Sequence, residues 1–266
     1  MAAIPPLRLG FLYPGHAAED DYPRLAAMLT KPVVVEVVHT ALGDDGDAHT
    51  IDALRDMGES ERLAAGARTL ATRNVAAVMW ACTSGSFVYG WDGARRQARA
   101  LGAQLGVPAA STSLAFVRAI RAIGARRVAV AATYPSDVAR CFVEFLAEAG
   151  IEVSDLSASG IMTATEAGDV DDEAVIAMVS AADRPDADAV LVPDTALHTV
   201  RVLPRLEAIV GKPVLTANQV SVWAALDLIG VAGAGADAGR LFAGDVSEPE
   251  VVRPVPEPAH EVRRSS

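Results

Sequence analysis

The fold of this chain is indicated by one stretch, AVMWACTSGSF at residues 77–87. Its apolar beginning has the length of a buried parallel strand, and this run ends in the thiol of Cys82, followed by hydroxyls and a glycine. In parallel α/β sheets, ligands bind at the carboxyl ends of the strands. The stretch therefore predicts a buried strand that delivers Cys82, Thr83 and Ser84 to a ligand-binding edge.

The same pattern occurs a second time, in AVLVPDTALHT at residues 189–199. Aligning the two stretches places Asp194 at the position of Cys82 and Thr195 at that of Thr83. The repeat also pairs GVPAAST at 106–112 with GKPVLTA at 211–217, each followed by an amphipathic helical pattern, and LGFLYP at 9–14 with VAVAATYP at 128–135. A repeat of this kind predicts two similar halves around a pseudo-two-fold axis, with Cys82 and Asp194 face to face.

The alternation of apolar strands with helical patterns predicts an α/β protein with two doubly wound parallel sheets, Rossmann- or flavodoxin-like, and a site between them. We expect strands at residues 7–13, 32–38, 77–81, 126–133, 151–153 and 187–192, and helices at 91–105, 113–123, 137–149, 171–182, 200–210 and 219–229. The expected first half comprises residues 1–112 with 218–245, and the second comprises 113–217. Residues 246–266, rich in proline and charge, are expected to form a flexible tail.

The composition restricts the class of protein. With 266 residues, 51% of them hydrophobic, the chain can bury a large core. It has no apolar run of the roughly 20 residues that a membrane helix needs, no amino-terminal signal pattern, and too few cysteines for a disulfide framework. We therefore expect a soluble, cytoplasmic protein. The net charge of −11 argues against binding to nucleic acid or to a membrane, so an anionic substrate must be held by local donors.

Motifs that would indicate other functions are missing or have simpler interpretations. The loop after the first expected strand lacks the G-x-G-x-x-G pattern of dinucleotide sites. The segment GDDGD at residues 43–47 lacks the glutamate that closes a calcium loop and is interpreted as a solvated turn. Cys141 lies in an apolar helical stripe and is assigned no role. The residues therefore indicate neither a dinucleotide site nor a calcium loop.

Four segments resemble the aspartate/glutamate racemase superfamily, and within it the arylmalonate decarboxylase and maleate isomerase branch. They are CTSGSF at 82–87, RVAVAATY at 127–134 with Asp137-Val138, DTALHT at 194–199 and GRLF at 239–242. The resemblance extends from Leu7 to about Phe242. It implies an enzyme without metal or organic cofactor, in which one or two cysteines at the two strand ends act on a carbon–hydrogen or carbon–carboxylate bond. Hydroxyls and backbone amides then stabilise the charge of an enediolate.

The resemblance also implies roles for individual residues. Cys82 matches the first cysteine of the racemases and isomerases, whereas Thr83, Ser84 and Tyr134 match the oxyanion-binding hydroxyls of the decarboxylase. The chain departs from this pattern at Asp194, where both the decarboxylases and the maleate isomerases have cysteine. The predicted site therefore has the catalytic residues Cys82 and Asp194 and the substrate-binding residues Pro14, Thr83, Ser84, Tyr134, Thr195 and Ala196.

The residues by themselves leave several alternatives open. Cys82 is either a proton donor or nucleophile, or an inert buried thiol. Asp194 either takes part in the chemistry or caps the following helix. His198 either sets the protonation of Asp194 or is structural.

Three functions follow for a small mono- or dicarboxylate ligand. The first is an arylmalonate decarboxylase-like lyase in which Cys82 protonates a carbanion. The second is a racemase or cis–trans isomerase in which Cys82 and Asp194 act from opposite faces. The third is a non-catalytic carboxylate-binding protein. The oligomeric state is left open, including a homo-oligomer.

Overall fold

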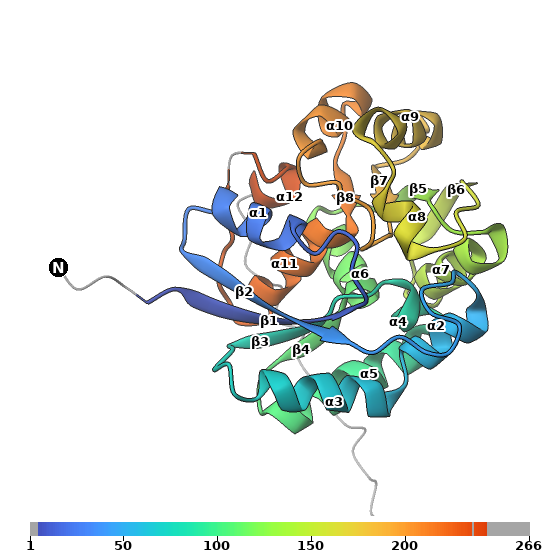
Figure 1. The fold of residues 1–266 in the computed structure, drawn as a ribbon. Coiled ribbons are helices and arrows are strands. Elements are labelled where there is room, and N and C mark those ends of the chain that lie inside the picture. The colour runs from blue at the N-terminus through green and yellow to red at the C-terminus, as the bar shows by residue number, and fades with distance from the viewer. Residues whose placement is uncertain (1–4, 236, 244–266) are drawn as a thin grey trace, which may run out of the picture.

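The protein has two parallel sheets of four strands each (Figure 1). The computed structural model describes residues 5–235 and 237–243, so the predicted tail at 246–266 lies outside the described residues. The first sheet has the order β2-β1-β3-β4 and contains β1 (Leu7–Pro14), β2 (Val33–Thr40), β3 (Ala77–Trp80) and β4 (Ala109–Ser111). The second has the order β6-β5-β7-β8 and contains β5 (Arg127–Ala132), β6 (Glu152–Ala158), β7 (Ala189–Val192) and β8 (Val214–Thr216).

Helices alternate with these strands along the chain. They are α1 (Asp21–Met28), α2 (Ile51–Met57), α3 (Ser60–Leu70), α4 (Ser84–Phe87), α5 (Gly90–Leu105), α6 (Thr112–Ala122), α7 (Ser136–Glu148), α8 (Ala164–Gly168), α9 (Asp172–Ala182), α10 (Leu203–Val210), α11 (Ala217–Asp227) and α12 (Arg240–Ala243). The predicted fold class, two doubly wound α/β halves, is confirmed. In the described part of the chain, no helix combines the length and the apolar character of a membrane span.

The internal repeat is visible in the topology. Adding four to each strand number of the first sheet reproduces the order of the second sheet. In both sheets the last strand ends in a hydroxyl residue at the N-cap of the next helix: Ser111 Oγ accepts from the N–H of Leu114, and the N–H of Thr216 donates to the side chain of Gln219. Equivalent chain positions therefore reach equivalent places in the two halves.

Helix α11 departs from the prediction. The sequence pattern predicted an amphipathic helix after residue 217, but nearly every side chain of α11 is buried. The reason is its position, since α11 packs against α1, α6, both β3 and β4 of the first sheet, and β8 of the second. A helix that is covered on all sides needs no polar face. The assignment of residues 218–245 to the first half stays a prediction.

Candidate active site

A cavity of about 300 Å³ lies at the carboxyl ends of β1, β3 and β7 and is lined by residues from both halves of the chain. Most of the residues predicted from the sequence line it, namely Pro14, Cys82, Ser84, Asp194, Thr195 and Ala196. Thr83 and Tyr134 do not line it. The structure thus brings the two predicted catalytic residues to one cavity, and it separates two of the predicted substrate contacts from that cavity.

Cys82 is the second residue after β3, and only 3% of it is exposed. Its Sγ accepts a hydrogen bond from the N–H of Gly85 at 3.2 Å and lies 3.7 Å from the hydroxyl of Ser84. Burial raises the pKa of the thiol to about 11; the nearby Asp194 acts in the same direction, while the Gly85 and Ser84 donors oppose the rise. At neutral pH, Cys82 therefore holds its proton.

The space at position 85 favours glycine because two side chains lie close to where a Cβ would be. A Cβ at this position would lie 3.2 Å from Sγ of Cys82 and 3.1 Å from the ring of Trp80. The indole N–H of Trp80 also donates to the carbonyl of Gly85 at 3.3 Å. These contacts hold the turn between β3 and α4 so that the thiol faces the cavity and a backbone N–H faces the thiol.

The two hydroxyls after Cys82 have different environments. Thr83 is fully buried, and its Oγ1 has no hydrogen-bond partner among the described residues. Its carbonyl accepts a hydrogen bond from the hydroxyl of Ser113 at 2.7 Å, which ties the segment to α6. Ser84 lines the cavity. Of the two, Ser84 is the hydroxyl that can reach a bound carboxylate.

Asp194 stands after β7 where Cys82 stands after β3, and it too is 3% exposed. One carboxylate oxygen accepts a hydrogen bond from the hydroxyl of Thr133, and the other accepts from the N–H of Ala196 at 2.9 Å. The following helix, α10, has Val202 as its N-cap residue. The alternative in which Asp194 caps that helix is therefore wrong, and its carboxylate lines the cavity instead.

Two tyrosines related by the repeat support the loop that carries Asp194. The hydroxyl of Tyr134 donates to the carbonyl of Pro193 at 2.6 Å, and that of Tyr13 donates to the carbonyl of Thr195 at 3.1 Å. Burial raises the pKa of Tyr134 well above its ordinary value, so the phenol is neutral and acts as a donor. Because this proton is used by a backbone carbonyl, Tyr134 positions the loop.

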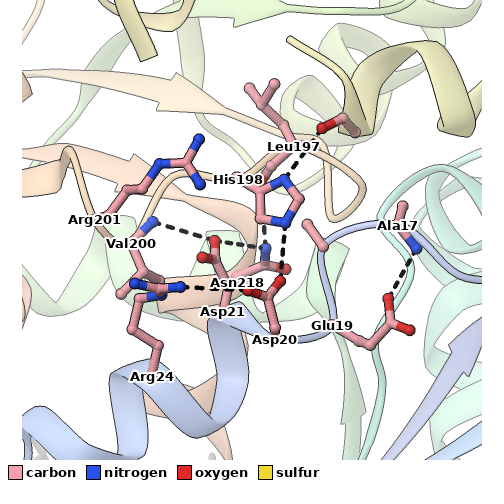
Figure 2. Close-up of polar contacts among 12 residues, drawn as sticks. Ala17, Glu19, Asp20, Asp21, Arg24, Leu197, His198, Val200, Arg201 and Asn218 are labelled. Carbon is pink, nitrogen blue, oxygen red and sulfur yellow. Dashed lines mark hydrogen bonds and ion pairs between the residues drawn. The ribbon is translucent and has the colours of Figure 1, made fainter. Parts of the chain in front are cut away.

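A buried carboxylate from the other half of the chain holds the same loop further on (Figure 2). Asp21, at the start of α1, accepts hydrogen bonds from the backbone N–H groups of Thr199 and Val200 at 2.8 and 3.1 Å, and from the side-chain amide of Asn218 at 3.2 Å. Burial raises the pKa of Asp21, while the donors from Thr199, Val200 and Asn218 lower it. The site loop is thus anchored by a residue that lies far away in sequence.

His198 lies beside the contact of Asp21 with the loop and does not line the cavity. Its Nε2 lies 2.8 Å from a carboxylate oxygen of Asp20, and its Nδ1 lies 3.2 Å from the carbonyl of Gly168 (Figure 2). It is not among the residues that line the cavity. Of the two alternatives for His198, these contacts favour the structural one.

A second contact between the halves covers the cavity. Asp47 accepts hydrogen bonds from the backbone N–H and the hydroxyl of Thr165 at 2.8 and 2.6 Å, and the N–H of His49 donates to the carbonyl of Met162 at 2.7 Å. Asp47, His49 and Thr165 line the cavity. Residues 43–47 form a turn. The turn also belongs to the site, because the carboxylate of Asp47 at its end binds Thr165 of the other half.

The lining of the cavity combines a few polar groups with an apolar wall. The apolar part includes Leu42, Leu54 and Met57, whereas Asp47 and Asp194 contribute carboxylates. No lysine or arginine lines this cavity in the described part of the chain. An anionic ligand must therefore be held by hydroxyls, backbone N–H groups and imidazoles, as the net charge of the chain had led us to expect.

Sequence analysis missed several lining residues, among them Tyr13, His49 and Met57. For Tyr13 a signal was present, because Tyr13-Pro14 aligns with Tyr134-Pro135 in the repeat. For His49 and Met57 there was none, since they enter the site through contacts between loops and helices that are distant in sequence.

Comparisons with known proteins agree with this geometry. The sequence model of the family described as arylmalonate decarboxylase matches residues 53–242. The chain is 31% identical to the arylmalonate decarboxylase of Bordetella bronchiseptica over 182 residues, which cover 66% of this chain and 75% of that protein. It is 30% identical to the maleate isomerase of Geobacillus stearothermophilus over 140 residues, which cover 52% of this chain and 55% of that protein.

A solved structure shares the fold. It is a mutant of the maleate cis-trans isomerase of Nocardia farcinica with a covalently bound succinylcysteine intermediate, and it matches with a TM-score of 0.82 and 22% identity over 89% of this chain and 98% of that chain. The family match covers both Cys82 and Asp194. The chain therefore belongs to the arylmalonate decarboxylase family, in the decarboxylase and maleate isomerase branch of the aspartate/glutamate racemase superfamily, and it is an enzyme.

Proposed function

We propose that the protein is a cofactor-independent lyase that decarboxylates a small malonate bearing an apolar substituent, with Cys82 as the proton donor. One observation carries this proposal: a thiol that burial keeps protonated faces a cavity with an apolar wall. A neutral thiol can give a proton to a carbanion without prior activation. The match to arylmalonate decarboxylase over much of the chain supports the same chemistry.

The proposed reaction uses the lining as follows. The hydroxyl of Ser84 and backbone N–H groups hold one carboxylate of the substrate, and the other lies toward the apolar side chains of Leu42, Leu54 and Met57. The bond between the α-carbon and this second carboxylate breaks, and carbon dioxide leaves. The electron pair delocalises into the retained carboxylate as an enediolate, which hydrogen bonds from the donors stabilise.

Protonation then completes the reaction. The proton on Sγ of Cys82 moves to the α-carbon and leaves a thiolate, which accepts hydrogen bonds from the Gly85 N–H and the Ser84 hydroxyl. Solvent returns the proton to the thiolate before the next turnover. Because the donor lies on one side of the cavity, the product has one handedness.

The position of Asp194 favours a second candidate function. Its carboxylate lines the cavity from the other half, and a base facing a thiol acid is the arrangement that a two-base racemase or isomerase needs. In this mechanism Asp194 removes the α-proton on one face while Cys82 delivers a proton on the other. A small carboxylate remains the substrate class in both functions.

Two assays distinguish these functions. The protein is incubated with malonates bearing aryl and alkyl substituents, and released carbon dioxide is measured; α-deuterium exchange and racemisation are followed with 2-aryl carboxylates. The lyase releases carbon dioxide, the racemase exchanges the α-proton without losing carbon, and a non-catalytic binding protein does neither.

Cys82→Ala should abolish turnover, whereas the matched variant Cys141→Ala should retain it because Cys141 lies outside the cavity.

Asp194→Asn provides the sharpest test. In the lyase, with Cys82 as the sole proton donor, this variant keeps substantial decarboxylation and yields one enantiomer. In the two-base mechanism, racemisation collapses because one face has lost its proton carrier. Loss of all decarboxylation in a folded Asp194→Asn variant, with the wild type active on the same malonate, rules out the single-donor mechanism.

A further inference from the structure

Two histidines and a glutamate converge beside the cavity. Nδ1 of His16 lies 2.9 Å from Oε1 of Glu19, and Nε2 of His39 lies 3.2 Å from the same oxygen. The two imidazole rings are 3.9 Å apart between centroids. All three potential ligand atoms lie within 4.8 Å of one another. His16 also lines the cavity, so the cluster adjoins the candidate active site.

The three residues come from elements that are paired in the first sheet. His39 lies in β2 opposite Tyr13 of β1, and His16 and Glu19 belong to the loop that follows β1. The second oxygen of Glu19 accepts the N–H of Ala17 at 2.8 Å, which Figure 2 shows. This hydrogen bond orients the carboxylate, so that its other oxygen, Oε1, faces both imidazoles.

We propose that His16, Glu19 and His39 form a binding site for a divalent transition-metal ion of the zinc type. Two imidazole nitrogens and one carboxylate oxygen are a ligand set that Zn²⁺ accepts, with bonds of about 2.0–2.2 Å. Ligand atoms on a tetrahedral ion with such bonds lie about 3.3 Å apart, close to the two separations to Oε1. The backbone N–H of Ala17 supplies the outer contact that orients a metal-binding carboxylate.

The three residues do not fill the coordination sphere of a zinc ion, so a further molecule can bind to the ion. Three protein ligands leave one position of a tetrahedral ion for water or for an anionic group. The cavity that His16 lines has no lysine or arginine among its described residues. The proposed ion lies beside this cavity, and the lyase mechanism proposed above does not use it. Its presence does not depend on which reaction Cys82 performs.

Zinc binding is tested on the full-length, tag-free chain, freed of metal with a chelator. Isothermal titration with Zn²⁺ should give one site at micromolar or tighter affinity, and Mg²⁺, which prefers oxygen ligands, should give none. Co²⁺ in place of Zn²⁺ should give the visible absorption of a four-coordinate site. Glu19→Gln and His39→Ala should each weaken Zn²⁺ binding at least tenfold and remove the cobalt absorption.

The control is Asp20→Asn, which removes the same charge one residue away from Glu19 without removing a ligand. This variant should bind Zn²⁺ within about twofold of the wild type. Thermal unfolding of each variant without metal verifies that the fold is retained. No Zn²⁺ binding to the wild type, or equal affinity in wild type and in folded His39→Ala, overturns the proposal and leaves the cluster as an ion pair between Glu19 and the two histidines.

Discussion

Cys82 and Asp194 occupy equivalent positions in the two halves and bring different ionisable groups to the cavity. Each accepts a backbone N–H from its own loop, from Gly85 and Ala196 respectively. Burial raises the pKa of the Cys82 thiol and keeps it protonated, whereas each carboxylate oxygen of Asp194 accepts a hydrogen bond. The cavity therefore has a neutral thiol from one half and a hydrogen-bonded carboxylate from the other.

The raised pKa of Cys82 predicts an unusual alkylation profile. With a pKa of about 11, roughly one thiol in 10³ is ionised at pH 8. In the Cys141→Ala background, the rate of reaction with iodoacetamide should increase about tenfold per pH unit from 7 to 10 without a plateau, because only the thiolate reacts. An exposed cysteine levels off near pH 9. A plateau below pH 9 in this background would contradict the assigned environment.

Tyr134→Phe separates a positioning role from a catalytic one. Because the hydroxyl donates to the carbonyl of Pro193 and does not line the cavity, its removal should cost about 1–2 kcal/mol of stability and lower kcat only a fewfold. Ser84→Ala, which removes a hydroxyl that lines the cavity, should lower kcat by about 10²-fold with little change in stability. Urea unfolding and steady-state kinetics measure both. A hundredfold loss in Tyr134→Phe restores the oxyanion role predicted from the sequence.

At the scale of elements, the segment between β7 and α10 is held in place by hydrogen bonds with residues outside the segment. It begins at Asp194, is supported by Tyr13 and Tyr134, and ends at the two N–H groups bound by Asp21. Helix α10 begins at Leu203, three residues later than the sequence pattern suggested, and the N–H groups of Thr199 and Val200 before it donate to Asp21.

Asp21→Ala is therefore expected to be one of the most disruptive single changes outside the cavity. It leaves the buried N–H groups of Thr199 and Val200 without a partner and removes one of the two hydrogen bonds of the Asn218 amide, so it should lower the free energy of unfolding by about 3 kcal/mol. Turnover should also fall because the loop carries Asp194. Asp20→Ala is the matched control: Asp20 is 56% exposed, so the cost should stay below about 1 kcal/mol. Equal stabilities of the two variants in denaturant would refute the anchoring role.

At the scale of the molecule, the site exists only where the two halves meet. The hydrogen bonds of Asp47 to Thr165 join the loop after β2 to the segment after β6 and cover the cavity. Partial burial raises the pKa of Asp47, but the hydrogen bonds from Thr165 outweigh it and lower the pKa below 3.8. The contact therefore contributes fully above pH 3.8 and is lost as pH falls through the lowered pKa.

Breaking the contact between Asp47 and Thr165 should expose the cavity to solvent while both halves stay folded. Asp47→Ala removes both hydrogen bonds and should increase the amide hydrogen exchange of residues 161–166 and raise KM, with a smaller change in kcat. Thr165→Val removes only the hydroxyl contact and keeps the N–H contact, so its effect should be smaller. Unchanged exchange in Asp47→Ala would show that other contacts close the cavity.

Buried strands and an internal repeat are the two structural features that the sequence predicted. The apolar runs before Cys82 and Asp194 predicted two buried strands, and the repeat of AVMWACTSGSF in AVLVPDTALHT predicted two equivalent sheets with these residues at equivalent edges. Such features depend on contacts between neighbours in sequence and on hydrophobic periodicity, so a single sequence records them. The family followed from the same segments.

The tertiary structure decided which of these residues reach the cavity. The sequence predicted Thr83 and Tyr134 as substrate contacts, yet one is buried against α6 and the other is bound to Pro193. Asp47 and His49 lie far from Cys82 in sequence, yet they line the same cavity. Sequence by itself determined the fold and the strand-end positions of Cys82 and Asp194. The direction of each side chain and the cover of the cavity depend on hydrogen bonds between distant loops, which have no periodicity that a single sequence can reveal.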